Sequence, residues 1–312
     1  MSALIFGALA FDTLMQFEGR FAEQILPEEV DRLSVSFPVP TMRREFGGCA
    51  GNIAYNMALL GEAGWPACVV GSDFAPYALW LDENNVDRRY VRELADEFTA
   101  QAFITSDIEG NQITAFHPGA MAHDVMAHMP RDAGVRIGVI APDGAQPMQR
   151  AARYFEAAKV PFLWDPGQFM TSLNAQQMTE FVQRARWVSV NRYEAELLAK
   201  GTGQSLATLS RQVRALVVTQ GAEGSQIWSD GEMLEVPAAK VASAVDPTGC
   251  GDAYRAGLVY GLLRDATWTY CARVASVMGA LAVESHGTQN HRASFAQIAE
   301  RYEHSYNESI NE

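Results

Sequence analysis

The stretch Asp246-Pro-Thr-Gly-Cys-Gly-Asp-Ala-Tyr-Arg-Ala-Gly257 places a turn of small residues directly before a helical segment. Glycine has no Cβ, so this turn lets a ligand approach the backbone closely. The amides of Gly249, Cys250 and Gly251 would point at one spot at the positive end of the helix, which suits an anion. A carboxylate in that field, Asp252, suits a general base that takes a hydroxyl proton beside a transferring phosphoryl group. The alternative is that Asp252 only caps the helix and that the glycines only permit a turn.

A second glycine-rich turn, Gly47-Gly-Cys-Ala-Gly-Asn52, precedes a helical pattern that ends near residue 60. Paired glycines at the start of a helix let a small polar ligand reach the backbone. Asn52 offers both a donor and an acceptor to a hydroxyl group. The alternative is a simple turn without a ligand, because Gly-Gly pairs often mark turns.

A third segment, Val218-Thr-Gln-Gly-Ala-Glu-Gly224, continues a short apolar strand into glycine turns. Ligands of open α/β sheets bind outside the carboxyl ends of the strands, so this segment is a candidate nucleotide loop. A plain β-hairpin is the alternative.

A fourth segment, Asn191-Arg-Tyr-Glu194, also follows an apolar strand. An amide and a carboxylate together could hold a hydrated Mg²⁺ ion, which takes oxygen ligands and keeps several waters. The same spacing equally fits a helix start, with Asn191 as the N-cap and Glu194 as its capping-box partner.

Short apolar runs alternate with helical patterns along the chain, which predicts an α/β fold with a parallel sheet covered on both faces. The predicted strands cover residues 4–11, 67–71, 135–141, 162–164, 187–190 and 216–219. The predicted helices cover residues 52–60, 148–158, 174–184, 192–198, 251–263, 268–284 and 294–306.

Two stretches fit this alternation poorly, namely 12–45, which is rich in charges and prolines, and 98–116. The second is typical of a hairpin, with strands at 99–106 and 112–116 joined by a turn at Gly110-Asn111. We expect both stretches to form a small β lid, and residues 1–11, 46–97 and 117–312 to form the α/β domain. Long surface loops are the alternative, although loops of this length are uncommon in compact domains.

Composition narrows the classes of function. The 312 residues include 24 Lys and Arg against 37 Asp and Glu, and the formal net charge of −13 argues against a nucleic-acid partner. The four cysteines form no CxxC pair, so we expect free thiols and a cytoplasmic location. The sequence contains no run of about 18 apolar residues, so we expect no membrane span. The common GxxxxGK[ST] and GxGxxG phosphate motifs are absent, and none of the three lysines stands in a glycine-rich turn.

Taken together, and in their order along the chain, the four segments resemble those of the ribokinase-like family of carbohydrate and nucleoside kinases, often called the pfkB type. Residues 246–257 resemble its C-terminal signature, 47–52 its N-terminal glycine motif, 191–194 its NxxE element and 219–224 its nucleotide loop. The resemblance implies a three-layer α/β/α sandwich with a mostly parallel central sheet and a small β-sheet lid. It also implies ATP-dependent phosphorylation of a primary hydroxyl group, with Mg²⁺.

The resemblance assigns expected roles to individual residues. Asp252 would be the catalytic base, and Gly249, Cys250 and Gly251 would form the anion hole. Asp12 would hold substrate hydroxyls, with Gly48 and Asn52 beside it. The ATP site would include Asn191, Thr219, Gly221 and Gly224, with Glu194 and Asn191 serving Mg²⁺ through water and Asp246 a monovalent cation such as K⁺. Cys250 departs from the family, which usually has Ala, Gly or Ser there, but its amide would still serve.

The substrate is the harder question. Residues 116–121, 165–168 and 287–291 look similar to those of prokaryotic adenosine and nucleoside kinases, which implies a purine nucleoside phosphorylated at its 5′-hydroxyl. A base needs an aromatic slot and an amide, which Phe11, Phe103, Phe116 and Gln168 could supply. The alternatives are that these aromatic residues are ordinary lid core, that the substrate is a free sugar such as ribose or fructose, and that the chain is a catalytically silent ligand-binding regulator. An exposed lid edge would permit a homodimer.

Overall fold

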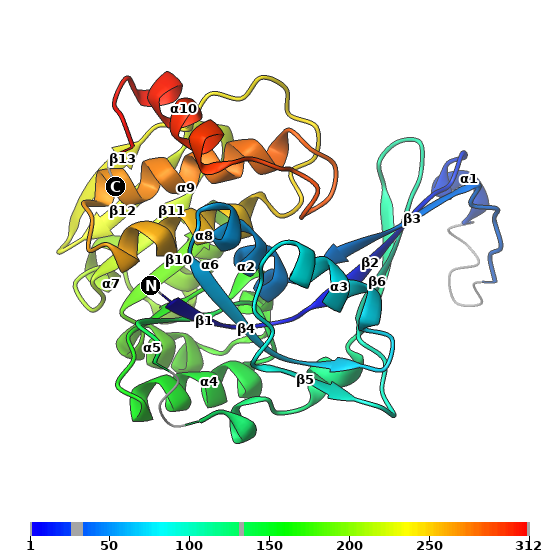
Figure 1. Cartoon of the computed structure of the whole chain (residues 1–312), viewed down its shortest axis with the longest axis horizontal. Coiled ribbons are helices and arrows are strands. Elements are labelled where there is room, and N and C mark those ends of the chain that lie inside the picture. The colour runs from blue at the N-terminus through cyan, green and yellow to red at the C-terminus, as the bar shows by residue number, and fades with distance from the viewer. Residues whose placement is uncertain (1, 26–33, 131–133, 311–312) are drawn as a thin grey trace.

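The central feature of the computed structural model, which describes residues 2–25, 34–130 and 134–310, is a nine-stranded sheet in the order β13-β12-β11-β10-β9-β8-β1-β4-β5 (Figure 1). Its parallel strands are β1 (Ser2–Phe6), β4 (Ala63–Gly71), β5 (Val91–Leu94), β8 (Ile137–Ile140), β9 (Phe162–Trp164), β10 (Trp187–Asn191) and β11 (Ala215–Thr219). The strands β12 (Ser225–Ser229) and β13 (Glu232–Val236) add an antiparallel edge. The predicted mostly parallel sheet is therefore confirmed.

Helices cover both faces of this sheet, as the continuous apolar strands require. In β1, Ala3 and Ile5 pack into one apolar cluster and Leu4 and Phe6 into another. The first cluster includes side chains of α2 (Cys49–Leu59), α3 (Ala75–Glu83), α8 (Cys250–Leu263) and α9 (Trp268–Val283), and α10 (Phe295–Tyr306) packs on α9. The second includes side chains of α4 (Ala145–Ala157), α5 (Ala175–Arg184), α6 (Arg192–Thr202) and α7 (Leu206–Leu209). The expected three-layer α/β/α sandwich is confirmed.

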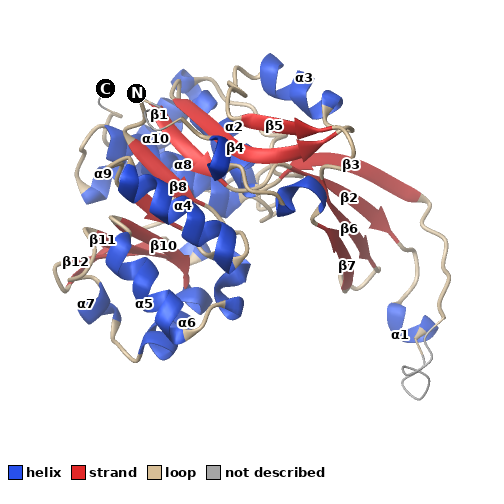
Figure 2. Ribbon diagram, turned by 90° about the horizontal axis from the view of Figure 1, so that it is seen from below, coloured by secondary structure: helices blue, strands red, loops and turns tan. Residues whose placement is uncertain are grey.

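A second sheet projects from one side of this body (Figure 2). It has the order β3-β2-β6-β7 and consists of β2 (Ala10–Gln16), β3 (Thr41–Gly47), β6 (Ala100–Ser106) and β7 (Gln112–His117). Only the β2–β6 pair is parallel. We call these four strands the lid sheet. The predicted hairpin at 99–116 is present as β6 and β7, and the short helix α1 (Phe21–Gln24) follows β2. Residues 26–33 of the predicted lid lie outside the described residues.

The strand predicted over residues 4–11 is wrong in its extent. The chain forms β1 and β2 there, which belong to different sheets. Between them, the carbonyl oxygen of Ala8 accepts the amide of Ala50 at 3.0 Å and that of Gly51 at 3.4 Å, at the start of α2. A contact across some forty residues therefore interrupts an apolar run that looks continuous in the sequence.

The helices α8 and α9 pack closely through small residues. A Cβ built on Gly257 would lie 2.5 Å from the Cα of Ala275, and one built on Gly261 would lie 2.9 Å from the Cα of Cys271. This contact fixes the position of α8, whose first turn carries Asp252. No helix in the described part of the chain is long and apolar enough to cross a membrane.

Candidate active site

The turn before α8 has the geometry that an anion site needs. Gly249 adopts φ 79°, and α8 begins at Cys250. The amide of Cys250 donates to the carbonyl of Pro247 at 3.2 Å. The amides of Gly249 and Gly251 have no acceptor among the described residues, so they are available to a ligand at the positive end of the helix. The structure thus leaves two of the three expected anion-hole amides free.

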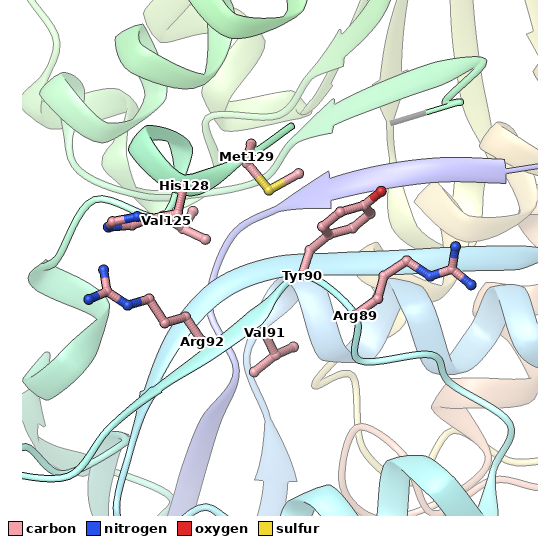
Figure 3. Close-up of a pocket in the computed structure, with 7 residues that line it drawn as sticks. All are labelled: Arg89, Tyr90, Val91, Arg92, Val125, His128 and Met129. Carbon is pink, nitrogen blue, oxygen red and sulfur yellow. The ribbon is translucent and has the colours of Figure 1, made fainter. Parts of the chain in front are cut away.

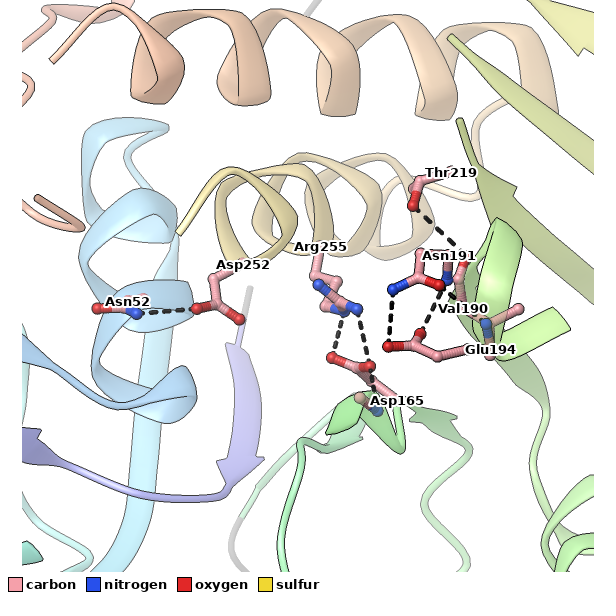
Figure 4. Close-up of polar contacts among 9 residues, drawn as sticks. Asn52, Asp165, Val190, Asn191, Glu194, Thr219, Asp252 and Arg255 are labelled. Carbon is pink, nitrogen blue, oxygen red and sulfur yellow. Dashed lines mark hydrogen bonds and ion pairs between the residues drawn. The ribbon is translucent and has the colours of Figure 1, made fainter. Parts of the chain in front are cut away.

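Asp252 lies in the first turn of α8 and is buried. Its Oδ2 accepts a hydrogen bond of 2.8 Å from Nδ2 of Asn52 in α2, so the structure brings the first two glycine segments together (Figure 4). Burial raises the pKa of Asp252, while the Arg255 guanidinium and the hydrogen bonds from Asn52 and Cys49 oppose that rise.

A polar network that the sequence did not reveal fixes the amide of Asn52. The Oδ1 of Asn52 accepts from Nε2 of Gln289 at 2.9 Å, and that nitrogen also contacts the Tyr77 hydroxyl at 2.6 Å. The Oε1 of Gln289 in turn accepts from Trp80 Nε1 at 2.9 Å. This network fixes which end of the Asn52 amide faces Asp252.

Asp12, in β2, faces the same region. A Cβ on Gly47 would collide with the Asp12 carboxylate, and one on Gly48, which has φ 84°, would lie 2.5 Å from the carbonyl oxygen of Ala8. A side chain at either position would collide with neighbouring atoms, so both positions require glycine. Burial, and then the negative charges of Asp252 and Glu45, raise the pKa of Asp12 to about 6.

Register in the lid sheet separates the expected base-binding residues. Asp12 pairs with Ala102, which pairs with Phe116, so Phe116 lies on the same face as Asp12. Phe103 pairs with Thr13 and lies on the opposite face. Phe11 is fully buried against Phe46 and Tyr77, which confirms the core alternative for this residue. Gln168 is exposed in the 3-10 helix η4 (Gly167–Ser172) after β9. Of the three expected phenylalanines, Phe116 alone is exposed on the Asp12 face.

The expected nucleotide loop opens onto a cavity of about 500 Å³. Thr219, Gly221 and Gly224 line it together with Cys250 and Gly251, so the third segment meets the anion turn. Most other lining residues are small or apolar, namely Ala222, Ala238, Ala239, Val241, Ala244, Pro247, Tyr254, Ser276, Gly279, Ala280 and Val283. Sequence analysis missed them, although the spacing of residues 276, 279, 280 and 283 marks one helix face. The hairpin alternative is also present, since β11 and β12 pair across this loop.

Asn191 and Glu194 form the capping box that was the alternative to a metal site. Asn191 Oδ1 accepts the Glu194 amide at 2.9 Å, and the Glu194 oxygens accept the Asn191 amide and Nδ2, each at 2.8 Å. Each carboxylate oxygen keeps a second acceptor position, which fits a water bound to Mg²⁺. Nowhere in the described residues do three His, Cys, Asp or Glu side chains gather as for a protein-held metal.

Asp246 connects two loops near the anion turn. Its Oδ1 accepts the Thr248 amide at 2.9 Å, and its Oδ2 accepts the Gly287 amide at 3.0 Å. Although partial burial raises its pKa, these hydrogen bonds from Gly287 and Thr248 give a net lowering, so Asp246 is ionised at neutral pH. An ionised carboxylate fits the expected role beside a monovalent cation.

One buried ion pair lies between these groups. The guanidinium of Arg255, one turn after Asp252, pairs through Nε and Nη2 with the two carboxylate oxygens of Asp165 at the end of β9 (Figure 4). Burial opposes the charged form, but the carboxylates of Asp165, Asp252 and Glu194 raise the pKa of Arg255. Arg255 is therefore a permanent cation within the site.

A second cavity, of about 350 Å³, lies beside β5 and the 3-10 helix η3 (Met126–His128) (Figure 3). None of the expected site residues lines it, and its Arg89 is already paired with Asp87. The candidate active site is therefore the region around the start of α8.

Comparisons with known proteins agree with this geometry. Over 304 residues the chain is 29% identical to a nucleoside kinase of Methanothermobacter thermautotrophicus, which covers 96% of this chain and 94% of that protein. The structure of Burkholderia thailandensis nucleoside kinase in complex with inosine has a TM-score of 0.87 and 39% identity, over 98% of this chain and 99% of that one. The nucleoside kinase structure from Methanocaldococcus jannaschii has a TM-score of 0.87 and 25% identity, over 97% and 98% of the two chains. The model of the pfkB family of carbohydrate kinases matches residues 16–294, and the chain belongs to this family.

Proposed function

We propose that the protein is a nucleoside kinase that transfers the γ-phosphoryl group of ATP to the 5′-hydroxyl of a purine nucleoside. The observation that carries the proposal is the position of the α8 N-terminus between two sites. On one side Cys250 and Gly251 line the apolar cavity, which suits a nucleotide base and ribose. On the other side Asp252 accepts a hydrogen bond from Asn52, and its negative charge acts on Asp12.

In this proposal Asp252 is the general base. Asn52 holds its Oδ2, which leaves Oδ1 to accept the proton of the attacking hydroxyl. The free amides of Gly249 and Gly251 stabilise the negative charge that grows on the phosphoryl oxygens. Mg²⁺, when bound, neutralises charge on the phosphates, with Glu194 and Asn191 holding its water ligands.

In this proposal the lid sheet supplies residues that bind the nucleoside, which accepts the phosphoryl group. Asp12, ionised at neutral pH, accepts hydrogen bonds from the sugar hydroxyls. Phe116 presents an exposed ring on the Asp12 face, which offers a stacking surface to a base. Closure of the lid would exclude water, a competing acceptor. The inosine complex of the Burkholderia relative supports a purine nucleoside as the acceptor.

The test is ADP release from Mg·ATP with adenosine, guanosine, inosine, cytidine, ribose, fructose or no acceptor. We expect turnover with the purine nucleosides and none above background with the free sugars. Turnover with a free sugar alone would overturn the nucleoside assignment and favour a sugar kinase. The absence of turnover with every acceptor, in a protein that still binds ligand, would favour the silent regulator.

The Phe116→Ala variant refines this test, with Phe103→Ala as its matched control from the opposite face of the same sheet. If Phe116 stacks on the base, its variant raises the KM for the nucleoside while the control does not. Equal effects of the two variants would remove Phe116 from the acceptor site.

A further inference from the structure

Arg255 is a buried arginine at the centre of the site, and no part of the proposed mechanism uses it so far. We propose that Arg255 is a catalytic residue whose Nη1 donates a hydrogen bond to the transferring phosphoryl group. This inference rests on the proposed phosphoryl transfer and not on which hydroxyl compound accepts the group.

Two of the three guanidinium nitrogens are occupied and one is free. Nε and Nη2 pair with Asp165, in the two-point geometry that fixes the plane of a guanidinium. Nη1 has no hydrogen bond or ion pair with any described residue, and a Cβ on Gly251 would collide with it. In Figure 4 this nitrogen points to the side of Asp252. The free donor therefore lies beside an anion-hole amide and on the side of the base.

The position of Arg255 matches the path of the phosphoryl group. Figure 4 places its side chain between Asp252 on one side and Asn191 and Glu194 on the other. A γ-phosphoryl group that moves from a nucleotide near Asn191 and Glu194 to a hydroxyl at Asp252 would therefore lie near this side chain. The side chain is only 11% exposed, so bulk water screens its charge weakly.

The local charges favour a cation at this position. Asp12, Asp165, Asp252 and Glu194 place four carboxylates in the site, and ATP adds further negative charge. The lysine that serves phosphates in many nucleotide-binding loops has no counterpart here, since the chain has only Lys159, Lys200 and Lys240 and none stands in a glycine-rich turn. Other arginines in this part of the fold are paired at the surface, namely Arg43 with Glu45, Arg44 with Asp73 and Arg192 with Glu223.

The ion pair itself explains how the donor is held. A buried arginine–carboxylate pair contributes little net stability, because both charges lose their hydration. Its effect is geometric, since Asp165, which is fully buried, fixes the guanidinium from the opposite side of the site. Nη1 is then preorganised before the substrates bind, as a transition-state donor must be.

The step balances without any proton transfer by Arg255. A lone pair of the acceptor oxygen forms the new bond to phosphorus. The bond from the γ-phosphorus to the bridging oxygen breaks, and its electron pair stays on ADP. The hydroxyl proton goes to Asp252. Arg255 stays protonated and stabilises the charge on the non-bridging oxygens.

The test compares kcat and KM of the wild type with three variants. The double variant Arg255→Met/Asp165→Asn removes the cation without leaving a buried carboxylate unpaired, and we expect it to lose about 100-fold or more in kcat. Arg255→Lys keeps a charge opposite Asp165 but cannot supply both the pair and Nη1, so we expect a loss in kcat here too. Asp165→Asn keeps the guanidinium, and we expect a smaller loss than in the double variant.

The matched control is Arg264→Met/Glu62→Gln, which removes a partly buried ion pair at the other end of α8. We expect it to keep the wild-type kcat. The proposal is wrong if the Arg255 double variant also keeps kcat, or if Asp165→Asn loses as much as the double variant. It is also wrong if the variants only shift the acidic limb of the pH profile and leave the plateau unchanged, because Arg255 would then act only through Asp252.

The wild-type acceptor panel tests the nucleoside proposal separately. The ratio of the variant's kcat to that of the wild type can be measured with whichever acceptor is turned over.

Discussion

At the scale of single residues, the account depends most on Asp252. The Asp252→Asn variant keeps the size of the side chain but cannot accept the hydroxyl proton. We expect kcat to fall by at least about 100-fold, as for loss of a general base. Binding of ATP, measured by calorimetry, should change little, because the apolar cavity does not include Asp252. Near-normal turnover by this variant would exclude Asp252 as the base.

Asp12 predicts a pH dependence of substrate capture. Its pKa is raised to about 6, first by burial and then by Asp252 and Glu45, so the carboxylate is ionised at pH 7 and protonated at pH 5. The ionised form accepts charge-assisted hydrogen bonds from sugar hydroxyls on both oxygens, and protonation makes one of these oxygens a donor. We therefore expect kcat/KM for the acceptor to fall as the pH drops through about 6. In Asp12→Asn this limb should disappear, together with much of the affinity at pH 7. An unchanged limb in the variant would assign it to another group.

The structure brings most of the site residues expected from the sequence close to the start of α8, but the contacts between them could not be predicted. The glycine turns and Asp252 could be found because their spacing is local. The network of Gln289, Tyr77 and Trp80 joins residues far apart in the chain, and so does the Arg255–Asp165 pair. The rings of the expected aromatic slot do not share one face for a simpler reason. In a strand, neighbouring residues face opposite sides, so the register of the lid sheet decides which rings lie together.

At the scale of elements, the contact between α8 and α9 controls the position of the catalytic turn. Gly257→Ala would place a Cβ 2.5 Å from the Cα of Ala275, so the helices must separate. We expect a loss of about 1–3 kcal/mol in the free energy of unfolding, measured with urea. Gly279→Ala is the matched control, because its Cβ would lie 3.5 Å from the nearest described atom and alanine favours the helix. Equal stability of the two variants would show that this contact is not close in solution.

Periodicity predicted the long helices, and hydrophobic runs predicted most of the parallel strands. The sequence did not reveal β5, β13 or the helix α3, whose apolar pattern is short, and it indicated β12 only through the hairpin alternative. The division of residues 2–16 between two sheets could not be predicted either. The run from residue 3 to residue 11 is apolar throughout, and the break within it depends on hydrogen bonds from α2 to Ala8.

At the scale of the whole molecule, the lid sheet predicts self-association. All residues of β7 are exposed, and this strand forms one edge of the sheet. On the face opposite Asp12, Phe103 and Ile113 are 40% and 45% exposed. An uncovered apolar edge favours pairing with a second copy, so we expect the mass of a dimer in light scattering. The Ile113→Lys variant should shift this equilibrium to the monomer, and a wild-type mass of one chain at micromolar concentration would contradict the prediction.

The central claim is that this site delivers a phosphoryl group to the 5′-hydroxyl of a nucleoside. Phosphorus NMR of the product formed from inosine and Mg·ATP tests it most directly, with 5′-deoxyinosine as the control acceptor. The account predicts a single new phosphomonoester whose phosphorus couples to the two 5′ protons, and no product from the control. A phosphate at another hydroxyl, or product from 5′-deoxyinosine, would contradict it.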